Sequence, residues 1–367
     1  MDTNKKVRML TIFLIVLMVL GGGVSLAAFS QYKSIMESPM KAFITDRQQA
    51  SASGKQMNAQ TSSTDTVASE SAATPAEDQI TYNGSAYVPN QNVINILLLG
   101  IDWDASRKDM GWRSDMNMLC TVDFAQNKIS LTSIPRDTRA KVYTVNQKNG
   151  EIKSSGLDKI NAAYSYGGGP DKFGAENAMR CIGEFTSVNG KYTVPIDYYI
   201  SIDLQGIPKF ASALGGVTVT LDVNFPGLGK KGDTIVLNEK NSRSYLENRK
   251  EVGGEMVRIS HEQQYLMAVA QKIKEKGAVA SAPALYANLM KFMHTNLSLE
   301  QIIALSRVLD NVEVDDITLQ TITGTFDYID SISYFIADTE DVESKVVSLM
   351  YTSVSEPGDA QAPGETP

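Results

Sequence analysis

Aspartates and arginines gather in the stretch 93–141, beside runs of apolar residues. Arg113 and Asp115 are two residues apart at the start of an expected strand, so their side chains leave the same face. Asp102 directly follows another expected strand, and open α/β sheets bind ligands at such strand ends. Two carboxylates at that edge suit Mg²⁺, which shares phosphate oxygens and keeps water ligands. The pattern predicts a site for a metal and a polyanion; the alternative is an exposed Arg113–Asp115 ion pair of little energetic value.

A second charged group follows the third expected strand, in SIPRDT at residues 133–138. Pro135 cannot extend a central ladder of hydrogen bonds, so the chain must leave the sheet there. Arg136 is thereby expected at the rim, where its planar guanidinium matches phosphate oxygens. We assign Arg136 to the ligand and Asp137, in the same binding site, to orienting neighbouring groups. The alternative is a turn capped by Asp137 with Arg136 on the surface.

A third charged group is YLENRKEVGGEMVRISHEQQYL at residues 245–266. Arg249 and Arg258 flank its Gly253-Gly254 loop, which leads into an expected helix. Backbone amides at a helix start add hydrogen-bond donors for an anion. Charged loops before helices are common, but these arginines, with the two upstream, give four that can converge on one anion.

The elements that must position these residues alternate along the chain. This alternation predicts a three-layer α/β/α domain with a central mixed β-sheet. Strands are expected at 93–101, 116–124, 128–134, 198–204, 216–222 and 317–323, and helices at 171–186, 206–214, 260–276, 283–294, 298–311 and 338–351. Ser260 with Gln263, and Ser298 with Gln301, form capping-box patterns at two of these helix starts.

An apolar run at residues 9–29 follows Lys5, Lys6 and Arg8. At helical rise it is long enough to cross roughly 30 Å of hydrocarbon, and the preceding positive charges predict a cytoplasmic N-terminus. A cleaved signal peptide ending near Ala27 is the alternative. We prefer a retained single-pass anchor, since apolar residues continue beyond the glycines at 21–23.

Composition divides the rest of the chain. We expect a cytoplasmic tail at 1–8, a transmembrane anchor at 9–29, a disordered extracellular tether at 30–90, a folded domain at 91–352 and a disordered tail at 353–367. The tether is rich in Ser, Thr, Ala and Gln and lacks the apolar surface that offsets chain entropy. Only 32–44 within it could form a short helix.

Charge and rare residues exclude several classes of protein. A pI near 5.0 and a net charge of -8 argue against nucleic acid as a partner, because phosphate backbones require a basic face. Two cysteines make neither a disulfide framework nor a metal cluster. Two histidines, His261 and His294, leave little material for Ser-His triads or His-rich zinc sites.

Several motifs resemble those of LytR-CpsA-Psr proteins in order and spacing. They are GID at 100–102, WRSDMNML at 112–119, SIPRDT at 133–138, KINAAYSYGG at 159–168, PIDYYISID at 195–203 and ALGGVTVTL at 213–221. The resemblance covers roughly 93–275 and implies that the folded domain is catalytic. It implies a phosphotransferase that moves a glycopolymer, such as teichoic acid or capsule, from a polyprenyl pyrophosphate carrier onto peptidoglycan. An apolar cleft for the lipid tail beside a Mg²⁺-pyrophosphate site is implied as well.

The resemblance also assigns roles to residues. Asp102 and Asp115 match the family's magnesium-site aspartates, and Arg113 and Arg136 match its pyrophosphate-binding arginines. Asp102 is the candidate for activating the acceptor hydroxyl, and Arg136 the candidate for stabilising the transferring phosphoryl group. The family's Tyr-x-Arg-x-Arg pattern begins here at Tyr245, but Glu247 replaces the first arginine and only the second, Arg249, is in place.

The family pattern Asp-x-x-Arg-x-x-Arg-Gln becomes Glu255, Arg258, His261 and Glu262 here. We place Arg258 and His261 among the substrate-binding residues, although His261 could instead partner Glu255 or the backbone. The added acidic residues lower positive charge where a pyrophosphate is expected. Two alternatives to the transferase therefore stand: a non-catalytic polyprenyl-phosphate-binding or regulatory wall protein, and a lipid pyrophosphate hydrolase.

Overall fold

The computed structural model describes residues 30, 32–44, 79–102, 111–204, 206–248, 252–290 and 292–354. At its centre is a six-stranded sheet with the order β11-β8-β3-β4-β5-β12. The pairs β3–β8 and β5–β12 are parallel, and the others are antiparallel, so the predicted mixed sheet is confirmed. Its strands are β3 (Val93–Asp102), β4 (Arg113–Asp123), β5 (Lys128–Ser133), β8 (Tyr198–Asp203), β11 (Met293–Thr295) and β12 (Thr318–Thr321).

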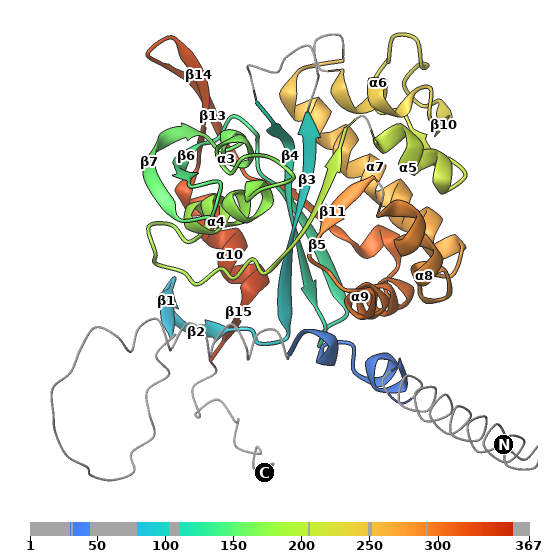
Figure 1. Cartoon of the computed structure of the whole chain (residues 1–367), viewed down its shortest axis with the longest axis horizontal. Helices are drawn as coiled ribbons and strands as arrows, with labels where there is room; N and C mark the ends of the chain where they lie inside the picture. Colours follow the sequence, from blue (N-terminus) through green and yellow to red (C-terminus); the bar gives the residue numbers. More distant parts are fainter. Residues whose placement is uncertain are drawn as a thin grey trace, which may run out of the picture.

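Helices cover both faces of this sheet, with α3, α4 and α10 on one side and α5 to α9 on the other (Figure 1). Along β3, Leu97 and Leu99 pack into the core under the first group, whereas Ile94 and Ile96 pack under the second. This alternation is what the two-residue period of a strand requires. The helices are α3 (Ala162–Tyr166), α4 (Gly174–Thr186), α5 (Ile207–Ala213), α6 (Ser242–Glu247), α7 (Glu255–Glu275), α8 (Ala278–Leu289), α9 (Leu299–Asn311) and α10 (Thr339–Met350).

Smaller sheets lie around the central one. They are formed by β1 (Ile80–Tyr82), β2 (Ser85–Pro89) and β15 (Tyr351–Ser353); by β6 (Arg139–Val145) and β7 (Ile152–Lys159); by β9 (Val217–Thr220) and β10 (Thr234–Leu237); and by β13 (Gly324–Ile329) and β14 (Ile332–Ala337). The β13–β14 hairpin is absent from the prediction. Its turn residues Asp330 and Ser331 adopt positive φ angles of 51° and 67° without the glycine that usually marks such a turn.

The predicted start of the helix at 283–294 is wrong. α8 begins at Ala278, and the carboxylate of Asp310 on α9 accepts hydrogen bonds from the N–H groups of Ala278 and Val279 at 3.1 and 3.3 Å. Met293 and His294 belong to β11 instead. A cap supplied by another helix leaves no local sequence signal, so the start could not be read from neighbouring residues. The capping box at the start of α9 is confirmed.

The tether predicted at 30–90 is folded at its first end. Helical turns occur within 32–44, where the side chain of Phe43 is completely buried. The Phe43 ring lies 5.3 Å from the rings of Phe124 and Tyr198, measured between centroids. Ile35 is buried in the same part of the core, so apolar side chains of this segment hold it under the sheet.

The other predicted boundaries also shift. β1 and β2 fold the second end of the tether region, and β15 extends the domain to Ser353, which pairs with Tyr87. The middle of the tether, the tail from 355 and the anchor predicted at 9–29 lie outside the described residues. In the described part of the chain, no helix combines the length and hydropathy that a membrane span requires.

Candidate active site

A β-bulge sets the direction of the Asp115 side chain. Gly100 pairs with Met116 and Ile101 pairs with Ser114, so Asp115 has no opposite residue on β3. Bulges re-aim a side chain and free its backbone groups from the ladder. Asp115 therefore departs from the regular pleat at the edge of the sheet where β3 ends.

Asn161 joins Arg113 to Asp115. Its Oδ1 accepts a hydrogen bond from Nη1 of Arg113 at 3.2 Å, and its Nδ2 donates to Oδ1 of Asp115 at 3.2 Å. Its backbone N–H donates to the carbonyl of Arg136, and its carbonyl accepts from the N–H of Ser114. This buried asparagine thus orients both charged side chains of β4, which point together as predicted.

Arg136 contacts Asp115 from the loop that follows β5. Nη1 of Arg136 donates to Oδ2 of Asp115, and Nε lies 3.4 Å from Oε1 of Glu255. The hydroxyl of Thr138 donates to the carbonyl of Pro135 at 2.6 Å and closes the turn. The chain leaves the sheet at the proline, as predicted, and the guanidinium lies at the rim.

Arg258 reaches the same cluster from α7. Its guanidinium donates to the carboxylates of Glu255 and Glu262, and Nη2 donates to the backbone carbonyl of Asp115 at 2.9 Å. That carbonyl belongs to the bulged residue. The three acceptors hold Arg258 against the charged edge of the sheet although its side chain is almost fully buried.

The helix start predicted at Ser260 is wrong, because α7 begins at Glu255 after Gly254, whose φ angle is 96°. Ser260 and Gln263 lie within the helix, where their side chains contact other elements instead of capping. The hydroxyl of Ser260 donates to Oδ2 of Asp222 at 3.3 Å, and Nε2 of Gln263 donates to the carbonyl of Gln320 at 2.9 Å. Tertiary partners have replaced the local capping box.

Burial shifts the proton affinity of two carboxylates in this cluster. It raises the pKa of Glu262 to about 8, although the neighbouring Arg258 lowers it. Burial also raises the pKa of Asp115, against the lowering effects of Arg136 and Arg258. The charge of Asp102 raises the pKa of Asp115 further, which means that the two aspartates feel one another's charge.

Asp102 ends β3 and lies opposite Arg113 in the ladder between β3 and β4. The described residues hold no group of three or more His, Cys, Asp or Glu side chains suited to a metal ion. A divalent ion at Asp102 and Asp115 would therefore draw its remaining ligands from water and phosphate, which is the usual habit of Mg²⁺. The two oxygens of Asp115 each retain a lone pair beyond their bonds to Asn161 and Arg136. The carboxylates of Asp102 and Asp115 thus fit a Mg²⁺ ion whose other ligands are water and phosphate.

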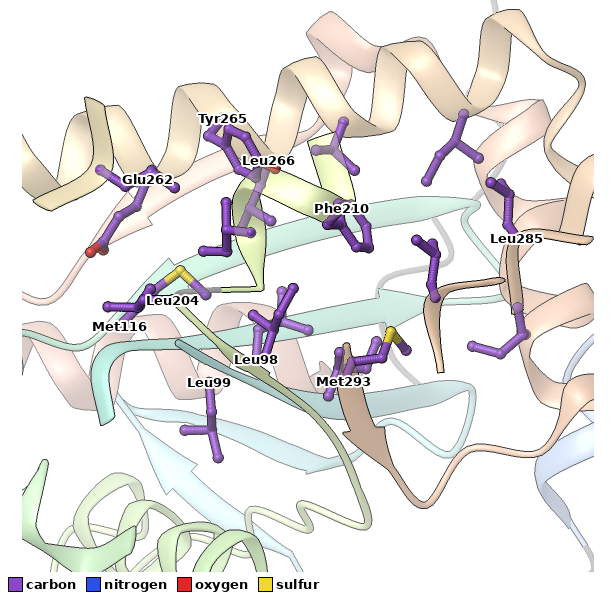
Figure 2. Close-up of a pocket in the computed structure, with 18 of the residues that line it drawn as sticks. Leu98, Leu99, Met116, Leu204, Phe210, Glu262, Tyr265, Leu266, Leu285 and Met293 are labelled. Atoms are coloured by element: carbon purple, nitrogen blue, oxygen red, sulfur yellow. The ribbon is translucent and has the colours of Figure 1, made fainter. Parts of the chain in front are cut away.

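An apolar cavity of about 280 Å³ opens beside the charged cluster. Arg258 and Glu262 belong to its lining, so the charged and apolar regions are continuous. Figure 2 shows Glu262 and Met116 at one end of the cavity and Leu285 and Met293 toward the other. The remaining lining is almost entirely aliphatic and aromatic, from β3, β8, α5, α7, α8 and α9.

The structure packs His261 against aromatic rings and Asp222 instead of placing it in the charged cluster, and a phosphate contact at this residue stays a prediction. Its ring is completely buried, stacked on Tyr245 at a centroid distance of 4.7 Å, and close to Phe225 at 5.6 Å. Nε2 of His261 lies 3.0 Å from Oδ1 of Asp222. From the sequence, the alternative partner of His261 was Glu255 or a backbone group. An aromatic stack with a carboxylate from a distant loop has taken the side chain away from the cluster.

Asp137, another predicted site residue, has contacts of its own beside the cluster. Oδ1 of Asp137 lies 2.9 Å from Nζ of Lys159, and its backbone carbonyl accepts a hydrogen bond from Phe335 at 2.8 Å. Asp137 thus contacts Lys159 and β14, and its role in orienting the site stays a prediction. Arg249 lies outside the described residues.

Two residues of the cluster, Asn161 and Glu255, were missing from the prediction, as was Asp222, the partner of His261. Asn161 lies in the KINAAYSYGG motif, and Glu255 stands at the acidic position of the family pattern, so each had a signal that carried no assigned role. Asp222 had none. Its partners Ser260, His261 and Gln264 lie about forty residues further along the chain.

The chain is similar in sequence to a known family and to curated proteins. The chain matches the model of the LytR_cpsA_psr family over residues 47–349. The Bacillus mycoides (strain KBAB4) protein named polyisoprenyl-teichoic acid–peptidoglycan teichoic acid transferase TagU is 29% identical over 221 residues. That match spans 59% of this chain and 64% of the relative, less than two thirds of its length.

Solved structures share the fold. The crystal structure of Bacillus subtilis TagV matches with a TM-score of 0.58 and 24% identity, over 71% of this chain and 96% of that one. The structure of TagT bound to LIIa-WTA matches with a TM-score of 0.52 and 22% identity, over 71% and 90% of the two chains. With the family model covering most of the sequence, this chain belongs to the LytR-CpsA-Psr family.

Proposed function

We propose that this protein transfers a glycopolymer from a polyprenyl pyrophosphate carrier onto peptidoglycan. The name of the TagU relative, which contains polyisoprenyl-teichoic acid, peptidoglycan and transferase, supports the donor, acceptor and reaction class. The LIIa-WTA ligand bound to TagT supports a wall polymer as the substrate. Teichoic acid is our first choice of polymer, and capsule is the second.

The observation that carries this proposal is the continuity of the charged cluster with the apolar cavity through Arg258 and Glu262. A ligand that fills both regions must be amphiphilic, with an anionic head and a long apolar tail. A polyprenyl diphosphate has this shape. Burial of its tail would supply binding energy that water-soluble sugar phosphates cannot obtain, at about 0.8 kcal/mol per buried methylene.

The arginines act on the phosphate charge. Arg113, Arg136 and Arg258 bind phosphate oxygens and neutralise the charge that builds up during transfer. For Arg136 and Arg258 this requires phosphate to compete with their present acceptors, Asp115 and Glu255. Such competition favours a doubly charged diphosphate over a weaker anion.

The reaction exchanges one phosphorus–oxygen bond for another. An acceptor sugar hydroxyl forms a bond to the phosphorus attached to the glycopolymer, and the bond from that phosphorus to the bridging oxygen breaks. Polyprenyl phosphate leaves with the electron pair of the broken bond. Asp102 takes the hydroxyl proton.

Mg²⁺ is part of the proposal, with Asp102 and Asp115 as its protein ligands. When bound, it would neutralise phosphate charge and help the leaving group depart. Asn161 orients Asp115 for this role, since it holds one carboxylate oxygen while Arg136 contacts the other.

Replacement of Arg136 tests the proposal most directly. In full-length protein reconstituted with lipid-linked glycopolymer and peptidoglycan, Arg136→Ala should abolish polymer transfer. Arg180→Ala, an exposed arginine on α4, is the matched control and should transfer like wild type. Transfer by Arg136→Ala at the wild-type rate contradicts the assignment. Intact lipid with no wall-linked product identifies a binding protein, and free sugar phosphate without dependence on acceptor identifies a hydrolase.

The lipid tail has its own test. Leu285→Trp places a larger side chain at the cavity wall. It should weaken binding of undecaprenyl phosphate at least tenfold, because the tail loses room, while inorganic pyrophosphate binding stays within twofold. Equal loss for both ligands would argue against a tail in this cavity.

The proposal includes membrane attachment with the domain outside the cytoplasm. This part rests on the sequence, namely the apolar run 9–29 after Lys5, Lys6 and Arg8. Fractionation of cells, combined with protease accessibility from the outer side, tests it.

A further inference from the structure

Large apolar side chains are exposed on the β13–β14 hairpin. Tyr328 is 74% exposed, and Phe326 and Ile332 are each 47% exposed. The Phe326 ring packs edge-on against the buried Phe335, with centroids 5.3 Å apart. The hairpin is therefore anchored in the core at its base while its tip presents rings to solvent. Grouped rings at the surface of a soluble domain usually mark an interaction site.

This hairpin is attached to the loop that carries Arg136. The N–H of Phe335 donates to the carbonyl of Asp137 at 2.8 Å, and Phe335 pairs with Thr138 in a parallel bridge. Figure 1 shows the hairpin projecting beyond the sheet on the side where β3 ends. The base of the hairpin is thus bonded, at Phe335, to the two residues that directly follow Arg136 in the chain.

A second cavity, of about 240 Å³, lies at the base of the hairpin. Ala337, which pairs with Gly324 where the hairpin begins, forms part of its wall. The cavity mixes charged, amide and apolar side chains, and its lining includes Arg139, Lys141, Leu157, Glu184 and Asn189. Sugars match such a surface, because their hydroxyl groups need donors and acceptors and their C–H faces need apolar contacts.

We propose that the hairpin tip and the cavity at its base bind the acceptor glycan strand, with sugar rings stacked on Phe326 and Tyr328. The inference rests on the proposed function, since it names the surface that receives the acceptor. The cation of Arg139 in this lining complements the carboxylates that the peptide groups of peptidoglycan carry, whereas Lys141 pairs with Glu184 at 3.1 Å. Bound along the hairpin, the strand would run toward the loop of Arg136.

A membrane surface is the other occupant that exposed rings can suggest, and the position of the hairpin opposes it. The segment 32–44, which follows the apolar run 9–29 in sequence, packs at the opposite end of the sheet from the hairpin (Figure 1). A glycan in the wall layer fits this placement better.

The test uses the full-length protein and chitotetraose, a β-1,4-linked N-acetylglucosamine tetramer, as a probe of the glycan backbone. Wild type should bind it, and Tyr328→Ala should weaken binding about fivefold, the scale expected for one lost aromatic stacking contact. Tyr328→Trp should restore binding, because it keeps a stacking ring. Tyr32→Ala, which removes an exposed ring from the other end of the domain, should bind like wild type.

Binding of chitotetraose requires no donor and no turnover, so this result is independent of polymer transfer. A wild type that fails to transfer polymer but shows the Tyr328 effect would reject the proposed function and keep the glycan surface. Failure of wild type to bind the probe, or equal binding by Tyr328→Ala, overturns the glycan surface. Loss of binding to phosphatidylglycerol vesicles by Tyr328→Ala, with chitotetraose binding unchanged, also overturns it and identifies a membrane contact.

Discussion

Nδ2 of Asn161 donates a hydrogen bond to Oδ1 of Asp115 over 3.2 Å. Asp115 sits at a bulge, where the ladder no longer dictates its direction, so this bond and the contact with Arg136 orient its carboxylate. The other side of the same amide accepts from Arg113. The neutral side chain of Asn161 thereby bridges the Asp115 carboxylate and the Arg113 guanidinium, which both face the proposed diphosphate.

Asn161→Ala should therefore lower polymer transfer without removing any charge. We expect a loss of about 10-fold to 100-fold, the range typical when the partner of a metal-binding carboxylate is removed. Transfer should be measured across a Mg²⁺ titration, because a misplaced Asp115 raises the concentration needed for half-maximal rate. Asn177→Ala, which removes a buried asparagine of α4 away from the site, is the control for a general loss of stability. A wild-type Mg²⁺ profile in Asn161→Ala would contradict the role given to Asn161.

Glu262 predicts a pH dependence of stability. Burial raises its pKa to about 8, against a lowering effect of Arg258, while in the unfolded chain it returns to about 4.3. Between these values the folded protein binds a proton that the unfolded chain has released, so the free energy of unfolding falls as pH rises from about 5 to 8. Glu262→Gln cannot titrate and should lose less Tm over this interval than wild type.

Calorimetry at pH 5 and pH 8 would check this difference. Glu184→Gln is the control, since Glu184 is a partly exposed acid that pairs with Lys141 at 3.1 Å. It should show the same decline in Tm as wild type. Parallel declines in wild type and Glu262→Gln would mean that Glu262 stays charged in the folded protein throughout.

His261 should matter for stability and not for phosphate. His261→Ala empties a fully buried space between Tyr245 and Phe225, which should lower the free energy of unfolding by about 2–4 kcal/mol. His261→Phe keeps the stacked ring and loses only the contact with Asp222, so it should lose less. Urea unfolding measures both values, and pyrophosphate affinity should match wild type in the phenylalanine variant. A tenfold weaker pyrophosphate affinity in His261→Phe would support the phosphate contact that the sequence suggested for His261.

Phe43 provides a test of where the folded domain begins. Its ring is completely buried beside Phe124 and Tyr198, so Phe43→Ala should lower the free energy of unfolding by about 3–5 kcal/mol. Tyr32→Ala, with a 43% exposed ring in the same segment, should change it by less than about 0.5 kcal/mol. If the two variants have equal stability, the segment is a tether after all.

The sequence alone determined the parts of this protein that depend on residues close together in the chain. Apolar runs bounded by turns located β3, β4 and β5, Pro135 located the exit from the sheet, and Ser298 with Gln301 located the start of α9. Short-range sterics and hydrogen bonding decide these features, so local patterns report them. The motifs also sufficed to identify the family.

Tertiary structure decided the features that require partners far along the chain. The bulge at Asp115, the bridge through Asn161 and the cap on α8 from Asp310 each join segments that no local pattern connects. His261 shows the reason most clearly. Its sequence position favoured a phosphate, but the gain from stacking on Tyr245 and contacting Asp222 exists only once three distant segments have packed together.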